Sequence, residues 1–356
     1  MIYFLAAALR SVSESKHLFR LLPPTLFIAS CFLECRADSP KVIDICEEDL
    51  LTHPPDGLVA AVGKESTALN QRVAQRLLDF RIMRLGGLEA AIFRTLHASR
   101  GRQSKKRGAE EDHSFRVWAP EAAANGVQVG AYWYYRQGVA VQEQVEQFLE
   151  AIRRACRIPR RYISSGESAT PLVGKRILLV VNSANHDRLP GEPDVAVLRR
   201  TLDALRELRK QTGVWPGYYP EMGSRENGGL TPVFATAARD LTADELADYR
   251  KCWLWISSFS AEPEEYAMPA FEHIWPTWTL WQYCPAETWR RKGRRGWIPA
   301  ITPREDYAGG FANLAFPEYP RGIMGAAIPL DCNRVNVSRT TVAELWNRHG
   351  WIASPE

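Results

Sequence analysis

The chain has 356 residues, enough for one large α/β domain or two smaller ones. Hydrophobic residues make up 46% and charged residues 24% of the sequence, so an ordinary core can form and global disorder is excluded. The net charge of +4 depends largely on two basic runs, residues 100–107 and 290–295, and neither lies in a recognisable nucleic-acid-binding motif. We therefore expect solvated loops there and no nucleic-acid partner, with attraction to an anionic cell envelope as a weaker functional alternative.

The N-terminal segment, residues 1–37, has the pattern of an export leader. Basic residues precede an apolar stretch at residues 21–33, and a small-x-small cleavage pattern ends at Ala37. Residues 28–31 also match a lipoprotein processing box, and the stretch is too short to span a bilayer comfortably. We expect export to the cell envelope or the outside, with an unprocessed N-terminus as the alternative, and one folded domain over residues 38–356.

Strand and helix signals alternate through the first two thirds of the chain, and strands dominate the rest. Apolar, β-branched or aromatic runs predict strands at residues 41–46, 88–96, 127–134, 176–181, 214–219, 253–256 and 277–283. Helical spacing of apolar residues and capping signals predict helices at residues 71–85, 115–124, 139–156, 195–211, 242–251 and 340–349. Two stretches rich in polar residues, Gly or Pro are predicted as loops, residues 98–112 and 285–330. This order predicts the α/β class, as an irregular TIM-type (β/α) barrel in a single domain.

Aromatic residues are the outlier in the composition. The chain has 12 Trp, which cluster between Trp253 and Trp297, and the strand expected at residues 127–134 ends in aromatic residues. A large aromatic core is the structural interpretation. The functional interpretation is a carbohydrate-binding cleft, because pyranose rings stack on flat aromatic faces. No C-x-x-C pair or His spacing suggests zinc, so we expect no metal.

In a parallel barrel the carboxyl ends of the strands meet at one mouth, where active sites form. Several polar and aromatic residues stand at or just beyond the expected strand ends. The candidate site residues are Asp44, Tyr132, Trp133, Asn182, Ala184, Tyr219, Trp281, Gln282, Tyr283 and Asp331. Each has a structural alternative, since an acid can cap a turn or lie in a loop and an aromatic residue can belong to the core. The positions converge only if the barrel closes.

Five phrases carry a resemblance to a known family. They are Gly130-Ala-Tyr132 and residues 212–219, 253–256, 278–283 and 331–336, in this order. On these phrases the chain resembles the family 25 glycoside hydrolases, lysozymes that cut peptidoglycan, over about residues 42–351. The resemblance implies cleavage of the β-1,4 bond between N-acetylmuramic acid and N-acetylglucosamine, without a cofactor.

The same resemblance implies roles for individual residues. Asp44 matches the acid of the first strand, and Asp331 matches the late acid of the family. The strand residues that it places along the cleft are Tyr132, Trp281, Gln282 and Tyr283.

The family's Asp-x-Glu pair, whose Glu donates the proton, is missing from this chain. Asn182 stands at the position of the Asp and Ala184 at the position of the Glu. A methyl group cannot protonate a leaving oxygen, and general acid catalysis contributes on the order of 10²–10⁴-fold. We expect weak or absent turnover, with a catalytically silent glycan-binding relative as the alternative. Asp187, Glu192 and Asp194 follow in an expected surface turn, so we do not expect them to replace the pair.

Overall fold

The computed structural model of the chain describes residues 41–46, 78–98, 109–136, 139–157, 171–185, 188, 191–224, 228–258, 263–284 and 330–354. The expected leader, the two basic runs and almost all of the expected loop at residues 285–330 lie outside this part of the chain. Within the described residues, no helix combines the length and the apolar character needed to cross a membrane.

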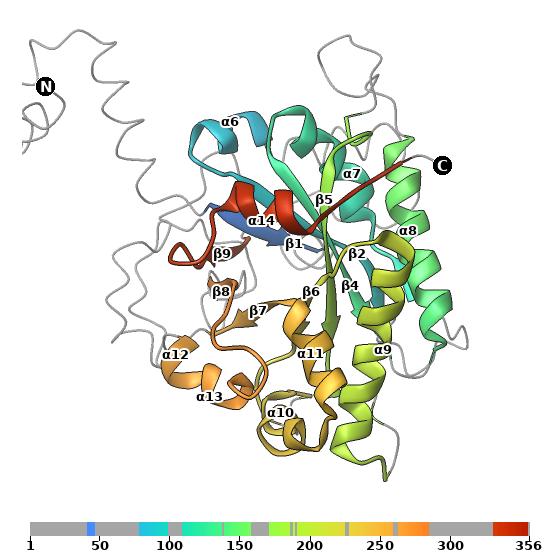
Figure 1. The fold of residues 1–356 in the computed structure, drawn as a ribbon. Coiled ribbons are helices and arrows are strands. Elements are labelled where there is room, and N and C mark those ends of the chain that lie inside the picture. Colours follow the sequence, from blue (N-terminus) through green and yellow to red (C-terminus); the bar gives the residue numbers. More distant parts are fainter. Residues whose placement is uncertain are drawn as a thin grey trace, which may run out of the picture.

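Eight of the ten strands of the sheet close into a barrel (Figure 1). Around the ring they are β1 (Val42–Ile45), β9 (Asp331–Val335), β8 (Leu280–Cys284), β7 (Trp253–Ser257), β6 (Gly217–Pro220), β5 (Arg176–Ser183), β4 (Gln128–Tyr135) and β2 (Ala90–Ala98). The ring closes because β1 pairs with both β2 and β9. Neighbouring strands are parallel except at β9, which runs antiparallel to β1 and β8. The expected irregular TIM-type α/β barrel is therefore confirmed.

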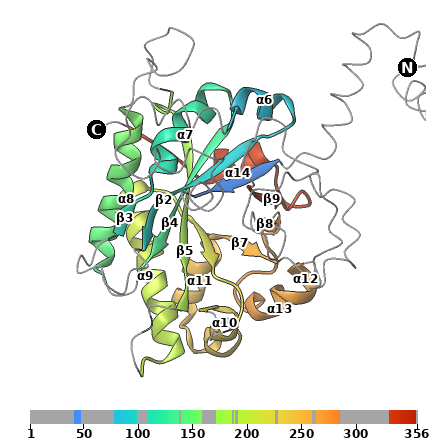
Figure 2. The ribbon, with the colours of Figure 1, turned by 180° about the vertical axis from the view of Figure 1, so that it is seen from behind.

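Helices cover the outside of the barrel unevenly (Figure 1, Figure 2). The long helices pack against β2, β4 and β5, and they are α7 (His113–Ala124), α8 (Val141–Cys156) and α9 (Asp194–Thr212). The later helices are shorter, and they are α10 (Thr231–Ala237), α11 (Ala243–Lys251), α12 (Pro263–Tyr266) and α13 (Met268–Phe271). These shorter helices fall toward the part of the chain in which strand signals dominate the sequence.

The strand pleat sorts the side chains into two layers, because successive residues point to opposite faces. The inner layer fills the barrel and includes Val42, Ala90, Ile92, Tyr132, Leu178, Val180, Trp253, Trp255, Leu280 and Val335. The larger outer layer lies between the strands and the helices. Gly217 leaves room for an inner aromatic ring, since a Cβ there would lie 2.1 Å from the indole of Trp253.

Helix α14 (Val342–His349) closes the base of the barrel. Its side chains Val342, Leu345 and Trp346 join the inner layer, and the indole Nε1 of Trp346 donates to the backbone oxygen of Val129 at 2.7 Å. Strand β10 (Gly350–Ile352) follows and pairs antiparallel with the start of β5.

Several elements differ from the sequence-based expectation. Strands β9 and β10 and the short helices α10, α12 and α13 were not expected. Strand β3 (Ala109–Glu111) forms at the end of the expected loop 98–112, and α6 (Phe80–Leu85) covers only the end of the expected helix 71–85. Residues 71–77 lie outside the described part. Strands β3 and β9 were missed because they are short and carry polar residues, so that pairing with a neighbouring strand stabilises them more than an apolar run does.

Candidate active site

The mouth of the barrel is the end opposite α14, where the parallel strands finish and β9 begins. The inward side chains at this level are polar, in contrast to the apolar inner layer beneath them. They are Asp44, Asn182, Tyr219, Gln282 and Asn333. Closure of the ring therefore brings together residues from five strands.

Asp44 is the centre of a buried hydrogen-bond network. The residue is 2% exposed, and Gln282 Nε2 lies 3.1 and 3.3 Å from its two carboxyl oxygens. Asn333 Nδ2 donates to Asp44 Oδ1 at 2.6 Å. Asp331 lies opposite Asp44 in the ladder between β1 and β9, and its side chain forms a further hydrogen bond to Asp44. The two acids that the resemblance singled out are thus neighbours.

Burial raises the pKa of Asp44 to about 6, because desolvation disfavours the charged carboxylate. The hydrogen bonds from Asn333, Gln282 and Asp331 act in the opposite direction and limit the rise. A hydrogen bond between two carboxyl groups requires a proton on one of them. The Asp44–Asp331 pair can therefore hold or release a proton close to neutral pH.

Aromatic donors hold the two amides in the orientation that Asp44 needs. The indole Nε1 of Trp255 donates to Asn333 Oδ1 at 2.9 Å, and the hydroxyl of Tyr219 donates to Gln282 Oε1 at 2.7 Å. An indole nitrogen can only donate, so it fixes the oxygen of Asn333 on its own side and turns the amide nitrogen toward Asp44. The network thus extends from the carboxyl pair to the aromatic residues of the mouth.

Three aromatic rings stand together on the inner face beside this network. Tyr219 stacks on Trp255 with 4.4 Å between ring centroids and an interplanar angle of 17°. Tyr132 meets Trp255 edge-on at 6.1 Å and 85°. Tyr219 is half-buried, and the other two rings are buried. Flat rings beside polar groups suit a carbohydrate ligand, whose sugar rings present apolar faces and hydroxyl edges.

The two positions expected for the Asp-x-Glu pair lie at the end of β5. Asn182 is buried and donates from Nδ2 to the backbone oxygen of Tyr219 at 2.9 Å, so it ties β5 to β6. Ala184 follows the strand and is 3% exposed. Neither side chain can give or accept a proton in a reaction, so the end of β5 supplies no acid at these two positions.

Three loop acids were considered as replacements for the missing Asp-x-Glu pair. The two that the structure describes form ion pairs with arginines. Glu192 pairs with Arg200, and Asp194 pairs with Arg188 at 2.6 Å, both near the start of α9. Asp187 lies outside the described residues. The contacts of the two described acids thus point to a structural role in this loop.

Comparison with known proteins gives matches among solved structures. No family model matches the sequence, and no curated protein matches it. A family 25 glycosyl hydrolase from Bacillus anthracis is 14% identical, with 88% of this chain and 94% of that chain covered and a TM-score of 0.44. A glycosyl hydrolase 25 of Streptococcus pneumoniae is 13% identical, with 91% and 98% covered and a TM-score of 0.44. A muramidase from Acremonium alcalophilum is 14% identical, with 75% and 90% covered and a TM-score of 0.43.

All three are similarities at low sequence identity. The strand pairs of this chain close the ring, and they establish the barrel fold by themselves.

Trp133, expected to line the family 25-like cleft, lies outside the barrel instead. Its ring is fully buried against α8, and its indole Nε1 donates to Gln144 Oε1 at 3.3 Å. The pleat explains the difference, since Tyr132 faces the interior and the next residue must face the helices. The expectation of substrate contact is therefore wrong for Trp133.

The same correction applies to Trp281 and Tyr283 on β8. The indole Nε1 of Trp281 donates to the backbone oxygen of Ser258 at 2.8 Å, and the ring of Tyr283 packs against that of Trp281 at 5.9 Å. Both belong to the outer layer, whereas Gln282 between them points to Asp44. A strand triplet cannot place all three side chains in one cleft.

Two members of the network, Trp255 and Asn333, were not among the expected site residues. Both could have been found from the period of two in a strand, because Trp255 lies two residues after the inward Trp253 and Asn333 lies two residues after Asp331. For Asn333 this step required β9 to be recognised as a strand.

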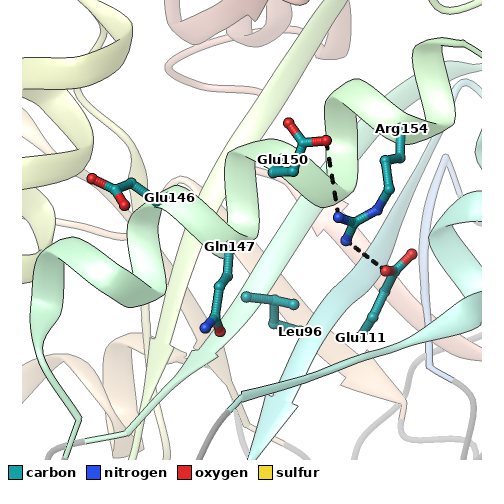
Figure 3. A pocket seen from close by; sticks show the side chains of 6 residues that line it. All are labelled: Leu96, Glu111, Glu146, Gln147, Glu150 and Arg154. Carbon is teal, nitrogen blue, oxygen red and sulfur yellow. Dashed lines mark hydrogen bonds and ion pairs between the residues drawn. The ribbon is translucent and has the colours of Figure 1, made fainter.

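A surface pocket of about 410 Å³ lies outside the barrel, between β2, β3 and α8 (Figure 3). Its lining residues are Leu96, Glu111, Glu146, Gln147, Glu150 and Arg154. Figure 3 shows Arg154 reaching toward both Glu111 and Glu150, with ion-pair distances of 2.7 and 3.9 Å. The pocket lies outside the barrel and is crossed by these ion pairs, so we do not include it in the candidate site.

Proposed function

We propose that this chain is a lysozyme-like glycoside hydrolase that binds peptidoglycan at the barrel mouth. Its reaction is slow cleavage of the β-1,4 bond between N-acetylmuramic acid and N-acetylglucosamine. The observation that carries this proposal is the buried Asp44, with a pKa of about 6 and with Asp331, Gln282 and Asn333 around it. The fold-level similarity to structures described as muramidases is consistent with the proposal.

The proposed binding surface is the half-buried ring of Tyr219, which the buried rings of Trp255 and Tyr132 support from behind. A sugar ring lies against the exposed part of Tyr219, and its hydroxyl groups bond with the amides and carboxyls behind it. The Asp44–Asp331 pair lies where positive charge develops at the anomeric carbon, and it accepts the proton of the attacking water. Residues 1–37 act as an export leader in this proposal, and residues 38–356 form the domain that acts outside the cell or in its envelope.

A catalytically silent glycan-binding protein is the second candidate. The observation that favours it is the pair of non-acidic side chains, Asn182 and Ala184, at the end of β5. Glycosidases of most families need two carboxyl groups around the scissile bond.

Release of reducing muropeptides from purified peptidoglycan separates the two candidates. We expect slow release by the unmodified chain and a loss of roughly 100-fold in Asp44→Asn, because the variant cannot exchange a proton at this position. Co-sedimentation with peptidoglycan measures binding independently and should change little. Asp244→Asn, an exposed substitution on α11, serves as the matched control. Binding without release identifies the silent protein, and failure to bind contradicts both candidates.

A further inference from the structure

Glu221 lies next to Ala184, the position at which the expected catalytic acid is missing. Glu221 directly follows β6, and the register pairs Asn182 with Tyr219 and Ser183 with Pro220. The backbone N–H of Glu221 donates to the oxygen of Ser183 at 2.7 Å, so the parallel ladder continues one residue beyond the strand. Ala184, directly after β5, and Glu221, directly after β6, therefore occupy adjacent positions at the mouth.

The pleat of β6, continued one residue beyond the strand, places Glu221 on the inner face. Tyr218 faces outward, where its ring packs on Phe234 and Trp275, whereas Tyr219 faces inward and stacks on Trp255. Glu221 comes two residues after Tyr219 and shares its face. Its backbone is held at both polar groups, since its oxygen also accepts from the N–H of Leu230 at 2.8 Å.

Electrostatics are consistent with this direction. Burial raises the pKa of the Tyr219 hydroxyl well above its ordinary value, and the negative charges of Glu221, Asp44 and Asp331 raise this pKa further. The three carboxyl groups therefore lie close enough to one hydroxyl to affect its ionisation. Tyr219 stands between Glu221 on its own strand and the Asp44–Asp331 pair, to which it connects through Gln282.

The ring order places these acids on opposite sides of the mouth. In a ring of eight, β6 is four strands from β1 in either direction, so Glu221 and Asp44 come from facing strands. A glycosidase needs this arrangement, with one carboxyl on each side of the bond that breaks. The end of β5, where Ala184 lies, is adjacent to the Glu221 side of the mouth.

We infer that Glu221 is the proton donor of this site, so that the acid absent at position 184 is supplied by the neighbouring strand. The inference rests on the proposed function. Glu221 gives its proton to the glycosidic oxygen as the bond from that oxygen to the anomeric carbon breaks. The oxygen of a water molecule bonds to the anomeric carbon, and the proton that this water loses goes to the Asp44–Asp331 pair. Solvent then carries a proton from the pair back to Glu221, which completes the cycle.

The leaving group provides the test, because a dinitrophenolate departs without a proton whereas a sugar hydroxyl needs one. The two substrates are peptidoglycan and a dinitrophenyl β-glycoside of the N-acetylglucosaminyl-N-acetylmuramic acid disaccharide. We expect Glu221→Gln to lower muropeptide release by roughly 100-fold and hydrolysis of the aryl glycoside by less than about tenfold. Glu207→Gln, on the outer surface of α9, is the matched control and should change neither rate.

Three other results are possible, and each contradicts either the role of Glu221 or the proposed function. Equal muropeptide release by Glu221→Gln and the unmodified chain removes the inference and leaves the proposed function intact. Equal loss on both substrates, with the circular dichroism spectrum and melting temperature unchanged, shows a positioning role and contradicts proton donation. Failure of the unmodified chain to cleave either substrate removes the proposed function, and the inference with it.

Discussion

Asp44 shows how burial and hydrogen bonding compete at a single carboxyl group. The group is buried, and the loss of water raises its pKa more than two amide donors and a second carboxyl lower it. A carboxyl group that functions only in its charged form would be expected beside a cation, which would lower its pKa. The contacts of Asp44 instead keep a protonated form accessible, which suits a group that exchanges protons.

The raised pKa of Asp44 predicts a dependence of stability on pH. Its value of about 6 in the native state exceeds the ordinary value of 3.8, so the native state binds this proton more tightly than the unfolded state does. The stabilisation is complete below about pH 4 and is lost as the pH rises through about 6, and it amounts to roughly 3 kcal/mol. Denaturant unfolding from about pH 4 to about pH 7 measures it.

Because other acids also titrate in this range, the decisive quantity is the difference between the unmodified chain and Asp44→Asn. The decline between about pH 4 and about pH 6 should disappear from the variant and persist in the exposed control Asp244→Asn. An unchanged decline in Asp44→Asn would assign the effect to another group.

At the scale of elements, α14 and β9 illustrate two kinds of sequence signal. Helix α14 has an apolar face at helical spacing and a capping box, in which Thr341 accepts from the Glu344 N–H at 3.2 Å and Glu344 accepts from the Thr341 N–H at 2.8 Å. These are local features, and a helix at residues 340–349 was predicted from the sequence. Strand β9 has only five residues, and its pairing partners lie far away in the chain. No local pattern predicted it.

The cap of α14 should contribute to stability without affecting the mouth. Thr341→Ala removes a side-chain acceptor at the first turn, and we expect the free energy of unfolding to fall by about 1 kcal/mol. Thr341→Ser keeps the hydroxyl and should restore most of this loss. Chemical denaturation measures both variants, and binding to peptidoglycan should stay the same because the helix lies at the opposite end of the barrel. A loss of binding in Thr341→Ala would show that the base and the mouth are coupled.

At the scale of the whole molecule, the closed ring makes the site and the core depend on one another. Asp44 near the start of the described chain meets Asn333 near its end, and this contact forms only when β1 and β9 complete the barrel. Two buried thiols, Cys156 on α8 and Cys252 at the end of α11, pack in the outer layer that the closed ring supports. Burial raises the pKa of Cys156 to about 11 and also raises the pKa of Cys252.

These two thiols should report on opening of the barrel. At neutral pH the native chain should resist thiol reagents at Cys156 and Cys252, because both groups are buried and protonated. Labelling should rise with denaturant in parallel with global unfolding, as followed by mass spectrometry. Ser338→Cys, at an exposed position, should react at once and serves as the control. Rapid native-state labelling of the buried pair would instead show local opening of the helices.

The amino-acid pattern was sufficient for the barrel class, most of the strands and helices, and the strand ends at which polar residues stand. These features depend on apolar runs, helical spacing and capping residues, which act over a few neighbouring positions. The resemblance also predicted the acids Asp44 and Asp331, which the structure places side by side. Their catalytic roles stay a prediction.

Which side chains share the mouth could not be obtained from those patterns. The pleat sends Trp133, Trp281 and Tyr283 to the outer layer, and the register of β5 and β6 brings Glu221 beside Ala184. Both outcomes depend on strand pairing between segments that are distant in sequence. Such pairing is established when the ring closes and buries its inner layer, because only then does each residue acquire a defined face and a defined neighbour.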